Sequence, residues 1–422
     1  TNEEDKRACC ATRLGRRLMP SLARVASVLP SATEILCFIG GERLLVGRSH
    51  EDNYPASVET LPILTGQTTA YTTAAQVDKV VSESIGKGES LYTLDIDTIK
   101  QLQPDVILTQ DICAVCAIDL QTVERIAASM RPRPNVVSLN PLNLDDVLSN
   151  ILQVGEAVGL QDEARAAHGA LVQRIETIDA LVSRRHQEQH APAPRVAFIE
   201  WPDPLYVGGH WTPQLIERAG GLHPLNAGGV DGGGKSFPVT SSAVVAIDPD
   251  IVILAPCGLN LEMTRREAEQ LATSDWWTSL RAVRAGRVVI VDGDAMFNRP
   301  GPRLVDALEW LYSAINDEPD AAPAGFPAEW LPPLEQRAEA PAAPQAASLP
   351  ELADIEEAHA CAVAAGKLQY VDPKTGYQVF TQLASSNRGY CCGSGCRHCV
   401  YDHTNVSAER RQKLKPPITV AV

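Results

Sequence analysis

The stretch RVASVLPSATEILCFIGG, residues 24–41, sets the architecture of the chain. Its first part is a short apolar run typical of a buried strand, and its second part carries apolar residues at helical spacing. Strand-like runs recur in DVILTQ (105–110) and NVVSLN (135–140). Alternating buried strands and helices predict an α/β fold whose parallel sheet is covered on both faces.

A second set of strand-like runs follows after a long interval, in RVAFIE (195–200), DIVILAP (250–256) and RVVIVDGD (287–294). The segments QPDVILTQ and DPDIVILAP, one in each half of the chain, are weakly similar in sequence. Between the two sets, two apolar helical stripes follow one another, and Gly159 is expected to end the first. We therefore predict two Rossmann-like lobes bridged by a long helix.

The chain has 422 residues, which is too long for a single hydrophobic core. Eight prolines between residues 318 and 350 exclude a regular element there and predict an extended linker. Within it, Trp330 and Leu331 could dock onto a lobe. The predicted organisation is an N-terminal extension (1–23), an N-lobe (24–141), bridging helices (142–190), a C-lobe (191–317), a Pro/Ala-rich linker (318–350) and a small Cys-rich C-terminal domain (351–422).

Charge and hydropathy exclude several classes of partner. The formal net charge is −15, which argues against binding to nucleic acid or to anionic membranes. No stretch approaches the roughly 20 apolar residues that a membrane span needs. The N-terminal segment lacks a separate apolar region of the kind found in secretory signals, so a cytoplasmic location is expected. Its Arg and Ala content leaves an organelle matrix as the alternative.

Polar and aromatic residues gather where the predicted strands end, and such ends face the crevice that binds ligands in open α/β sheets. GRSHEDNYP (47–55) follows a strand of the first lobe, and EWPDPLYVGGHW (200–211) takes the matching place in the second. The alternatives are an ordinary polar turn in the first lobe and rim packing in the second. The candidate ligand-binding residues are His50, Glu51, Tyr54, Glu200, Trp201, Tyr206, His210, Trp211 and Asn298.

TQDICAVCAID (109–119) places Cys113 and Cys116 on the same rim, as a metal or redox pair or as two small core residues. If Asp111 caps a helix, the helix dipole would lower the pKa of the Cys113 thiol. Further along, Arg303 opens an apolar helix and is predicted to pair with an acid at the lobe junction.

The C-terminal segment contains the run YCCGSGCRHC, which predicts a metal or Fe–S site. The candidate metal ligands there are Cys391, Cys392, Cys396 and Cys399. Zinc would take three cysteines plus His398 or His403, or four cysteines, whereas an Fe–S cluster would normally use cysteines only. The run GYCCGSGCRHC resembles a small uncharacterised domain that occurs alone or appended to other proteins, so a protein partner for this domain stays open.

Six stretches between residues 24 and 315 resemble the vitamin B12 periplasmic-binding-protein family, and more narrowly its cobalamin-binding branch. They are RVASVLPSATEILCFIGG, GRSHEDNYP, LTQDICAVCAID, EWPDPLYVGGHW, LAPCGL and FNRPGPRLVDALEWL. The resemblance implies two Rossmann-like lobes bridged by one long helix, with the corrinoid between them. Members of this branch usually have His-Glu-Cys-Asp where this chain has His50 to Asn53, so Asp52 replaces a cysteine.

We expect a soluble binding protein, with no catalytic residues, that holds cobalamin or a related metal-containing ligand between its lobes, plus zinc or an Fe–S cluster in the C-terminal domain. A histidine or thiolate could serve as an axial ligand to cobalt. The rival hypothesis is a metal-dependent enzyme or metal-handling protein with a second centre in the C-terminal domain. Its cleft metal would be bound by His50, Glu51, Asp52, Cys113, Cys116 and His210. A third is a degenerate scaffold subunit of a larger assembly.

Overall fold

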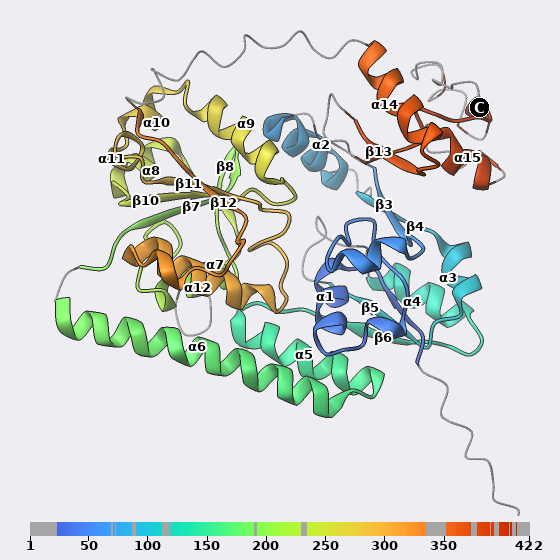
Figure 1. Cartoon of the computed structure of the whole chain (residues 1–422), viewed down its shortest axis with the longest axis horizontal. Coiled ribbons are helices and arrows are strands. Elements are labelled where there is room, and N and C mark those ends of the chain that lie inside the picture. Colours follow the sequence, from blue (N-terminus) through green and yellow to red (C-terminus); the bar gives the residue numbers. More distant parts are fainter. Residues whose placement is uncertain are drawn as a thin grey trace, which may run out of the picture. The chain divides into compact units, whose positions relative to one another are not determined.

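The computed structural model describes residues 23–68, 71, 73–86, 90–111, 118, 120–189, 192–228, 234–334, 352–372, 378–388, 390–391, 396–404, 406 and 411. It divides into two compact units (Figure 1). Unit 1 comprises residues 1–70 and 77–331 and contains both lobes, and unit 2 comprises residues 71–76 and 332–422.

The N-lobe is built on a four-stranded parallel sheet in the order β2-β1-β5-β6. Its strands are β1 (Val25–Ser27), β2 (Leu45–Gly47), β5 (Val106–Thr109) and β6 (Asn135–Ser138), with an added antiparallel ribbon of β3 (Thr65–Gln67) and β4 (Tyr92–Leu94). The chain leaves β1 toward β2 on one side and later places β5 on the other. The carboxyl ends of β1 and β5 therefore flank a topological switch point, where open α/β sheets bind ligands.

Helices cover this sheet and surround the switch point. Helix α1 begins at Pro30, whose fixed φ suits the first turn of a helix, and its first seven residues are buried. The helical segments of the lobe are α1 (Pro30–Phe38), η1 (Glu42–Leu44), η2 (Ala56–Thr60), α3 (Ile96–Leu102) and α4 (Leu120–Ser129). Helix α2 (Ala74–Gly86) begins in residues of unit 2 and continues in unit 1.

The C-lobe contains a six-stranded mixed sheet in the order β12-β11-β10-β7-β8-β9. Alternate residues of its parallel strands enter two separate cores: Phe198 and Ile253 face α7 and α12, whereas Ile199 and Leu254 face α8 to α11. The strands are β7 (Val196–Pro202), β8 (Leu205–Val207), β9 (Phe237–Pro238), β10 (Ile251–Leu254), β11 (Val288–Val291) and β12 (Ala328–Leu331). The helices are α7 (Trp211–Arg218), α8 (Ser241–Ile247), α9 (Leu261–Leu271), α10 (Asp275–Ser279), α11 (Arg281–Arg284), α12 (Arg303–Asn316) and η3 (Pro319–Ala321).

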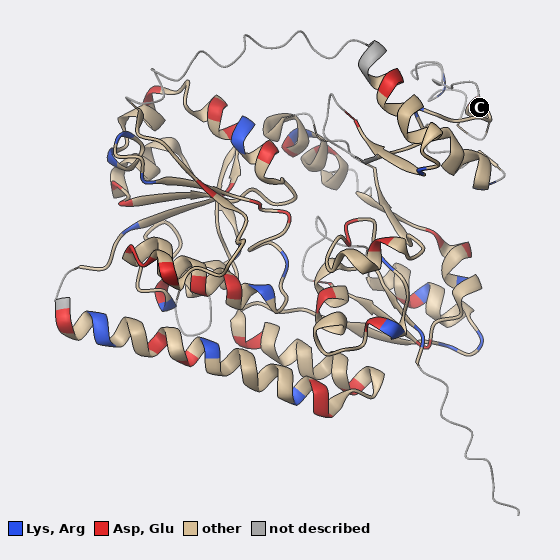
Figure 2. Cartoon of the chain, viewed as in Figure 1, with Lys and Arg blue, Asp and Glu red and all other residues tan. Residues whose placement is uncertain are grey.

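Two helices bridge the lobes. Helix α5 (Leu144–Val158) ends at Gly159, which takes the left-handed conformation with φ of 77° as predicted. Helix α6 (Gln161–Gln189) has 29 residues, or about 43 Å, which confirms the long bridging helix. It passes beneath α12 and α7 to reach α5 (Figure 1), and acidic and basic residues are distributed along it (Figure 2).

One hydrophobic core runs through both lobes and the bridge. It joins Ile35 of α1 and Ile151 of α5 to Ile175 of α6 and to Leu215 and Leu308 of the C-lobe. Because the same apolar cluster contains residues from every part of unit 1, the lobes and the bridge share one hydrophobic core.

The sequence between 318 and 350 differs from the prediction of a linker without regular elements. Residues Ala328–Leu331 form β12, which pairs antiparallel with β11 at the edge of the C-lobe sheet. Leu331 is buried in the lobe core, and the Arg287 guanidinium lies 5.0 Å from the centre of the Trp330 ring, so the predicted docking of these two residues is confirmed. Proline is tolerated at the ends of an edge strand, where ladder hydrogen bonds are not lost.

Unit 2 contains α14 (Leu352–Ala364), a two-stranded antiparallel ribbon of β13 (Gln369–Val371) and β14 (Gln378–Phe380), and α15 (Gln382–Arg388). Its small core includes Ile355, Ala362 and Tyr370. None of the helices among the described residues of the chain is long and apolar enough to span a membrane.

Candidate functional site

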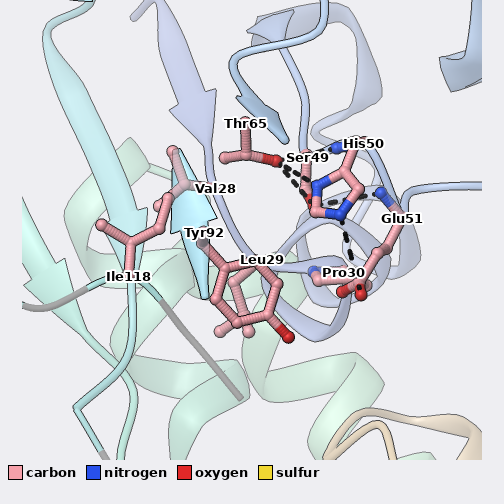
Figure 3. A pocket seen from close by; sticks show the side chains of 9 residues that line it. All are labelled: Val28, Leu29, Pro30, Ser49, His50, Glu51, Thr65, Tyr92 and Ile118. Atoms are coloured by element: carbon pink, nitrogen blue, oxygen red, sulfur yellow. Dashed lines mark hydrogen bonds and ion pairs between the residues drawn. The ribbon is translucent and has the colours of Figure 1, made fainter. Parts of the chain in front are cut away.

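A small cavity lies at the carboxyl ends of the N-lobe strands, at the switch point of the sheet. Its volume is about 10 Å³, close to the smallest space that holds one water molecule. The residues that line it are Val28, Leu29, Pro30, Ser49, His50, Glu51, Thr65, Tyr92 and Ile118 (Figure 3). Two of the residues predicted from the sequence, His50 and Glu51, are therefore placed together in one site.

His50 is fixed by the β3 strand beside it. Its backbone N–H donates to the Thr65 hydroxyl at 2.9 Å, and its ring Nδ1 lies 2.6 Å from the same oxygen (Figure 3). The other ring nitrogen, Nε2, is buried and has no hydrogen-bond partner among the described residues. The Glu51 carboxylate is its closest acidic neighbour, with Oε1 at 3.9 Å. The ring is therefore held in one orientation, with Nε2 buried and not hydrogen-bonded.

Burial, followed by the nearby Arg48 guanidinium, lowers the pKa of His50 to about 4, and the charge of Asp294 opposes the shift. The imidazole is consequently neutral at neutral pH. Burial, followed by the charge of Asp294, raises the pKa of the Glu51 carboxyl. The Glu51 side chain is 36% exposed, so solvent weakens both effects on it.

Asp52 does not line this cavity. Its Oδ2 accepts hydrogen bonds from the Thr33 hydroxyl at 2.5 Å and from the Ser49 N–H at 3.1 Å. Beneath the same loop, the Arg48 guanidinium donates to the carbonyls of Ser49 and Asp52. Through Oδ2, Asp52 thus fastens the loop to helix α1.

The second-lobe candidates surround the start of helix α7. Glu200 accepts a hydrogen bond from the Gly209 N–H at 3.2 Å, and the Trp201 indole donates to a carbonyl two residues on. A Cβ on Gly209 would lie 2.1 Å from the backbone nitrogen of Ser236, so glycine is required for this close approach. His210 has φ of 55°, and burial followed by Lys235 lowers its pKa. Trp201, Tyr206 and His210 remain partly exposed.

Two further candidates are held in structural positions. Trp211 is 8% exposed, belongs to the main core, and donates its indole N–H to the Phe297 carbonyl at 2.6 Å. The Asn298 side-chain amide donates to the carbonyls of Ala255 and Gly293 at 3.2 and 2.7 Å. Through these hydrogen bonds, both side chains stabilise loops of the C-lobe. Neither side chain is used in the function proposed below.

The lobe junction is held by charged groups. Arg303 donates two hydrogen bonds to the Glu34 carboxylate, at 2.8 and 2.5 Å, which confirms the predicted pairing with an acid at the junction. Its guanidinium carbon also lies 4.2 Å from the centre of the Tyr54 ring. The sequence did not single out Glu34, Thr65 or Tyr92, because each contacts the site from an element far away in the chain.

Cys113 and Cys116 lie outside the described residues, as does Cys392. In unit 2, the sulfurs of Cys391 and Cys399 lie 3.8 Å apart, and both residues are 4% exposed. Cys396 is partly buried. Within the described parts of the chain, no group of three or more His, Cys, Asp or Glu side chains is arranged to hold a metal ion. The predicted C-terminal metal site therefore stays a prediction.

Comparison with known proteins gives two family matches. Residues 25–295 match the family described as periplasmic binding protein, and residues 358–405 match a family of unknown function (DUF5522). An uncharacterized ABC transporter substrate-binding lipoprotein of Bacillus subtilis, YvrC, is 24% identical over 295 residues, which cover 69% of this chain and 79% of that protein.

Solved structures share the fold of unit 1. A periplasmic heme-binding protein from Pseudomonas aeruginosa matches with a TM-score of 0.53 and 22% identity, over 74% of this chain and 95% of that one. The periplasmic vitamin B12-binding protein BtuF of Vibrio cholerae matches with a TM-score of 0.50 and 18% identity, over 70% and 97%. The predicted fold of two α/β lobes bridged by a long helix is confirmed.

The predicted cytoplasmic location, with an organelle matrix as its alternative, is wrong. The matching family is described as periplasmic, and YvrC is named as a lipoprotein of an ABC transporter. The prediction failed because it depended on reading residues 1–23, which say nothing about the fold that follows them. With its family match spanning well over half of the sequence, the chain belongs to the periplasmic binding protein family.

Proposed function

We propose that unit 1 is an extracytoplasmic substrate-binding protein that holds cobalamin, or a related metal-containing macrocycle, between its lobes. In this proposal His50 is the axial ligand to the metal of the substrate. The observation that carries it is the buried, unpartnered Nε2 of His50 at the switch point of the N-lobe sheet, since a histidine binds metal through a neutral ring nitrogen.

The surroundings of His50 support this role. Metal-bound histidines usually have their other ring nitrogen hydrogen-bonded, which fixes the ring, and here Thr65 contacts Nδ1 at 2.6 Å. The cavity beside the ring is too small to enclose a macrocycle. The body of the substrate would therefore lie outside it, between His50 and the partly exposed Trp201, Tyr206 and His210 of the C-lobe. The flat rings of Trp201 and Tyr206 suit a macrocycle.

The relatives support the class of substrate. The Pseudomonas aeruginosa and Vibrio cholerae proteins are named for heme and vitamin B12. Both substrates present a metal with axial positions, which is the chemistry that a neutral imidazole accepts. The name of YvrC supports a transporter permease as the protein partner. One of the ligands in the rival enzyme hypothesis is Asp52, and its Oδ2 instead accepts hydrogen bonds from Thr33 and Ser49.

Titration of the full chain tests this proposal. With hydroxocobalamin, whose upper axial position exchanges, we expect saturable binding and a shift of the visible absorption to that of a histidine-ligated corrinoid. His50→Ala should remove the shift and weaken binding by about 10- to 100-fold, because it deletes the metal ligand. Hemin serves as the competing substrate, and cyanocobalamin as the probe whose axial positions are filled.

His186→Ala is the matched control, because His186 is exposed near the end of α6. It should bind like the unchanged protein. Equal spectra for the His50→Ala and unchanged proteins would show that His50 is not the axial ligand. The absence of binding by the unchanged protein to either macrocycle would refute the proposed substrate class.

We also propose a metal centre in unit 2, with Cys391 and Cys399 as two of its ligands. Metal–sulfur bonds of about 2.3 Å in a tetrahedral zinc site separate two sulfurs by about 3.8 Å. The sulfurs of these two buried residues are separated by 3.8 Å. His398 and His403 each have Nε2 within 2.7 Å of another polar group, so Cys392 and Cys396 are the preferred remaining ligands.

Elemental analysis of the purified chain tests this centre. We expect about one equivalent of zinc or an Fe–S cluster in the unchanged protein, and its loss in Cys399→Ser, since a hydroxyl is a poor replacement for a thiolate. Cys361→Ser is the matched control, because Cys361 is an exposed cysteine of the same unit. Visible absorption separates the two metals. A metal-free chain with a Cys391–Cys399 disulfide under non-reducing mass spectrometry would contradict the proposal.

A further inference from the structure

The segment that follows His50 is held by both lobes: Asp52 is bound by the N-lobe, and Glu51 and Asn53 are bound by the C-lobe. The Arg299 guanidinium, on the loop between β11 and α12, makes contacts from the C-lobe. Its Nη1 donates to Asn53 Oδ1 at 2.8 Å and to Glu34 Oε1 at 3.3 Å. Its Nη2 donates to the Glu51 carbonyl at 3.1 Å and to Asp294 Oδ2 at 3.0 Å. The two terminal nitrogens thus bind four acceptors, two of them in the segment beside His50.

Two neighbouring contacts act on the same segment. Asn53 donates from Nδ2 to Asp294 Oδ2 at 3.1 Å. Arg303 stacks on the Tyr54 ring while its guanidinium pairs with Glu34. We refer to these contacting residues as the interlobe cluster, and its members are Glu34, Glu51, Asn53, Tyr54, Asp294, Arg299 and Arg303.

His50 itself is held by the N-lobe alone. Thr65 of β3 binds both its backbone nitrogen and its ring, and Arg48 supports the loop from below. Residues 51–53 are therefore tied to the N-lobe through Asp52 and to the C-lobe through the Glu51 carbonyl and the Asn53 side chain. A change in the angle between the lobes therefore acts first on the Arg299 contacts, which lie one and three residues after His50.

We propose that Arg299 is a positioning residue that couples the candidate ligand His50 to the closure of the lobes. The proposal rests on the proposed function for the identity of the substrate, whereas the coupling itself concerns the chain alone. When the lobes approach, Arg299 engages Glu51 and Asn53 and orders the segment that carries His50. When they separate, those acceptors lose their donor, and the site loses its geometry.

Arginine is specifically suited to this role. Arg299 is 7% exposed and Glu34 is 4% exposed, so the charges at the centre of the cluster are almost fully removed from water. A planar guanidinium reaches four acceptors in fixed directions, whereas an ammonium is a compact point charge with three donors. Lysine at this position would keep the charge but could not donate to Glu51 and Asn53 at the same time in this geometry.

Hydrogen exchange of the substrate-free full chain tests the coupling without any assumption about the substrate. In Arg299→Lys, amides of residues 51–54 should exchange about tenfold faster or more, while amides of β7 and β10 keep their rates. Asn53→Ala removes one acceptor on the exposed side of the segment and should act in the same direction more weakly. If Arg299→Lys does not fold, Asn53→Ala replaces it as the test of the coupling.

Arg174→Lys is the matched control. Arg174 also joins two elements of unit 1, through Asp306 and Glu309, yet it is not part of the interlobe cluster. It should leave the exchange of residues 51–54 unchanged. Faster exchange throughout unit 1 in Arg299→Lys would indicate a general structural role and overturn the proposal, as would unchanged exchange of residues 51–54.

Binding kinetics supply the second readout. For a substrate that the unchanged protein binds, Arg299→Lys should raise the dissociation rate about tenfold, with association changed by less than about threefold, because the variant still reaches the open state. If the unchanged protein binds neither macrocycle, the proposed function fails, and the exchange experiment still decides the coupling. Equal dissociation rates in a chain that does bind would contradict the coupling.

Discussion

Replacing Glu34 with alanine is expected to lower the free energy of unfolding of unit 1 by about 3–5 kcal/mol. Glu34 lies on α1, and its buried carboxylate accepts hydrogen bonds from both Arg299 and Arg303. Removing it leaves two cations at the lobe junction, one of them 7% exposed, without their shared anion. The loss of a buried partner is costly because the remaining charges cannot regain their hydration.

Urea unfolding followed by far-ultraviolet circular dichroism measures this cost. Glu309→Ala is the control, because Glu309 pairs with Arg174 across two helices and keeps 22% exposure of its side chain. Its loss should cost about 1 kcal/mol, as for a partly solvated pair. If both variants lose a similar free energy of unfolding, the ion pairs of Glu34 stabilise unit 1 no more than an ordinary surface pair does.

The parts of the fold that could be predicted from the sequence depend on short-range patterns. Apolar runs such as Ile251–Leu254 and the left-handed stop at Gly159 carry their own signal within a few residues. Two sets of such runs, separated by long helical stripes, were enough to predict two bridged lobes. The pairing of Arg303 with an acid was predictable because an arginine that opens an apolar helix needs a partner at that end.

The parts that could not be predicted depend on contacts between distant segments. Thr65 orients His50 from a two-stranded ribbon whose strands have three residues each, too short for a periodic signal. Arg299 reaches Asn53 across 246 positions, and a single sequence carries no trace of that pairing. Trp211 follows a Gly-Gly turn as a ligand-site residue would, yet the same turn directs its ring into the core.

Replacing Asp52 with asparagine is expected to stabilise unit 1 at about pH 7.5, by up to roughly 3 kcal/mol. Asp52 is 2% exposed, and burial raises the pKa of its carboxyl to about 6. Its Oδ1 is buried without a hydrogen-bond partner among the described residues, so the ionised form is poorly solvated in the fold. Asparagine keeps an oxygen for the Thr33 and Ser49 donors and removes the charge.

The sign of the pH dependence follows from the raised pKa. The folded chain binds this proton more tightly than the unfolded chain, so the contribution of Asp52 favours folding most at low pH. That contribution is lost as the pH rises from about 4 through about 6. The advantage of Asp52→Asn over the unchanged chain should therefore grow with pH and nearly vanish at about pH 4.

Urea unfolding at about pH 4, 5 and 7.5 gives the required comparison, with Asp320→Asn as the control at an exposed carboxyl. The control should change stability by less than about 0.5 kcal/mol at each pH. A stabilisation by Asp52→Asn that does not vary with pH would mean that Asp52 has an ordinary pKa in the folded chain. A destabilisation at the highest pH would mean that its negative charge supports the loop, and Asp52 would then return as a candidate ligand of a metal beside His50.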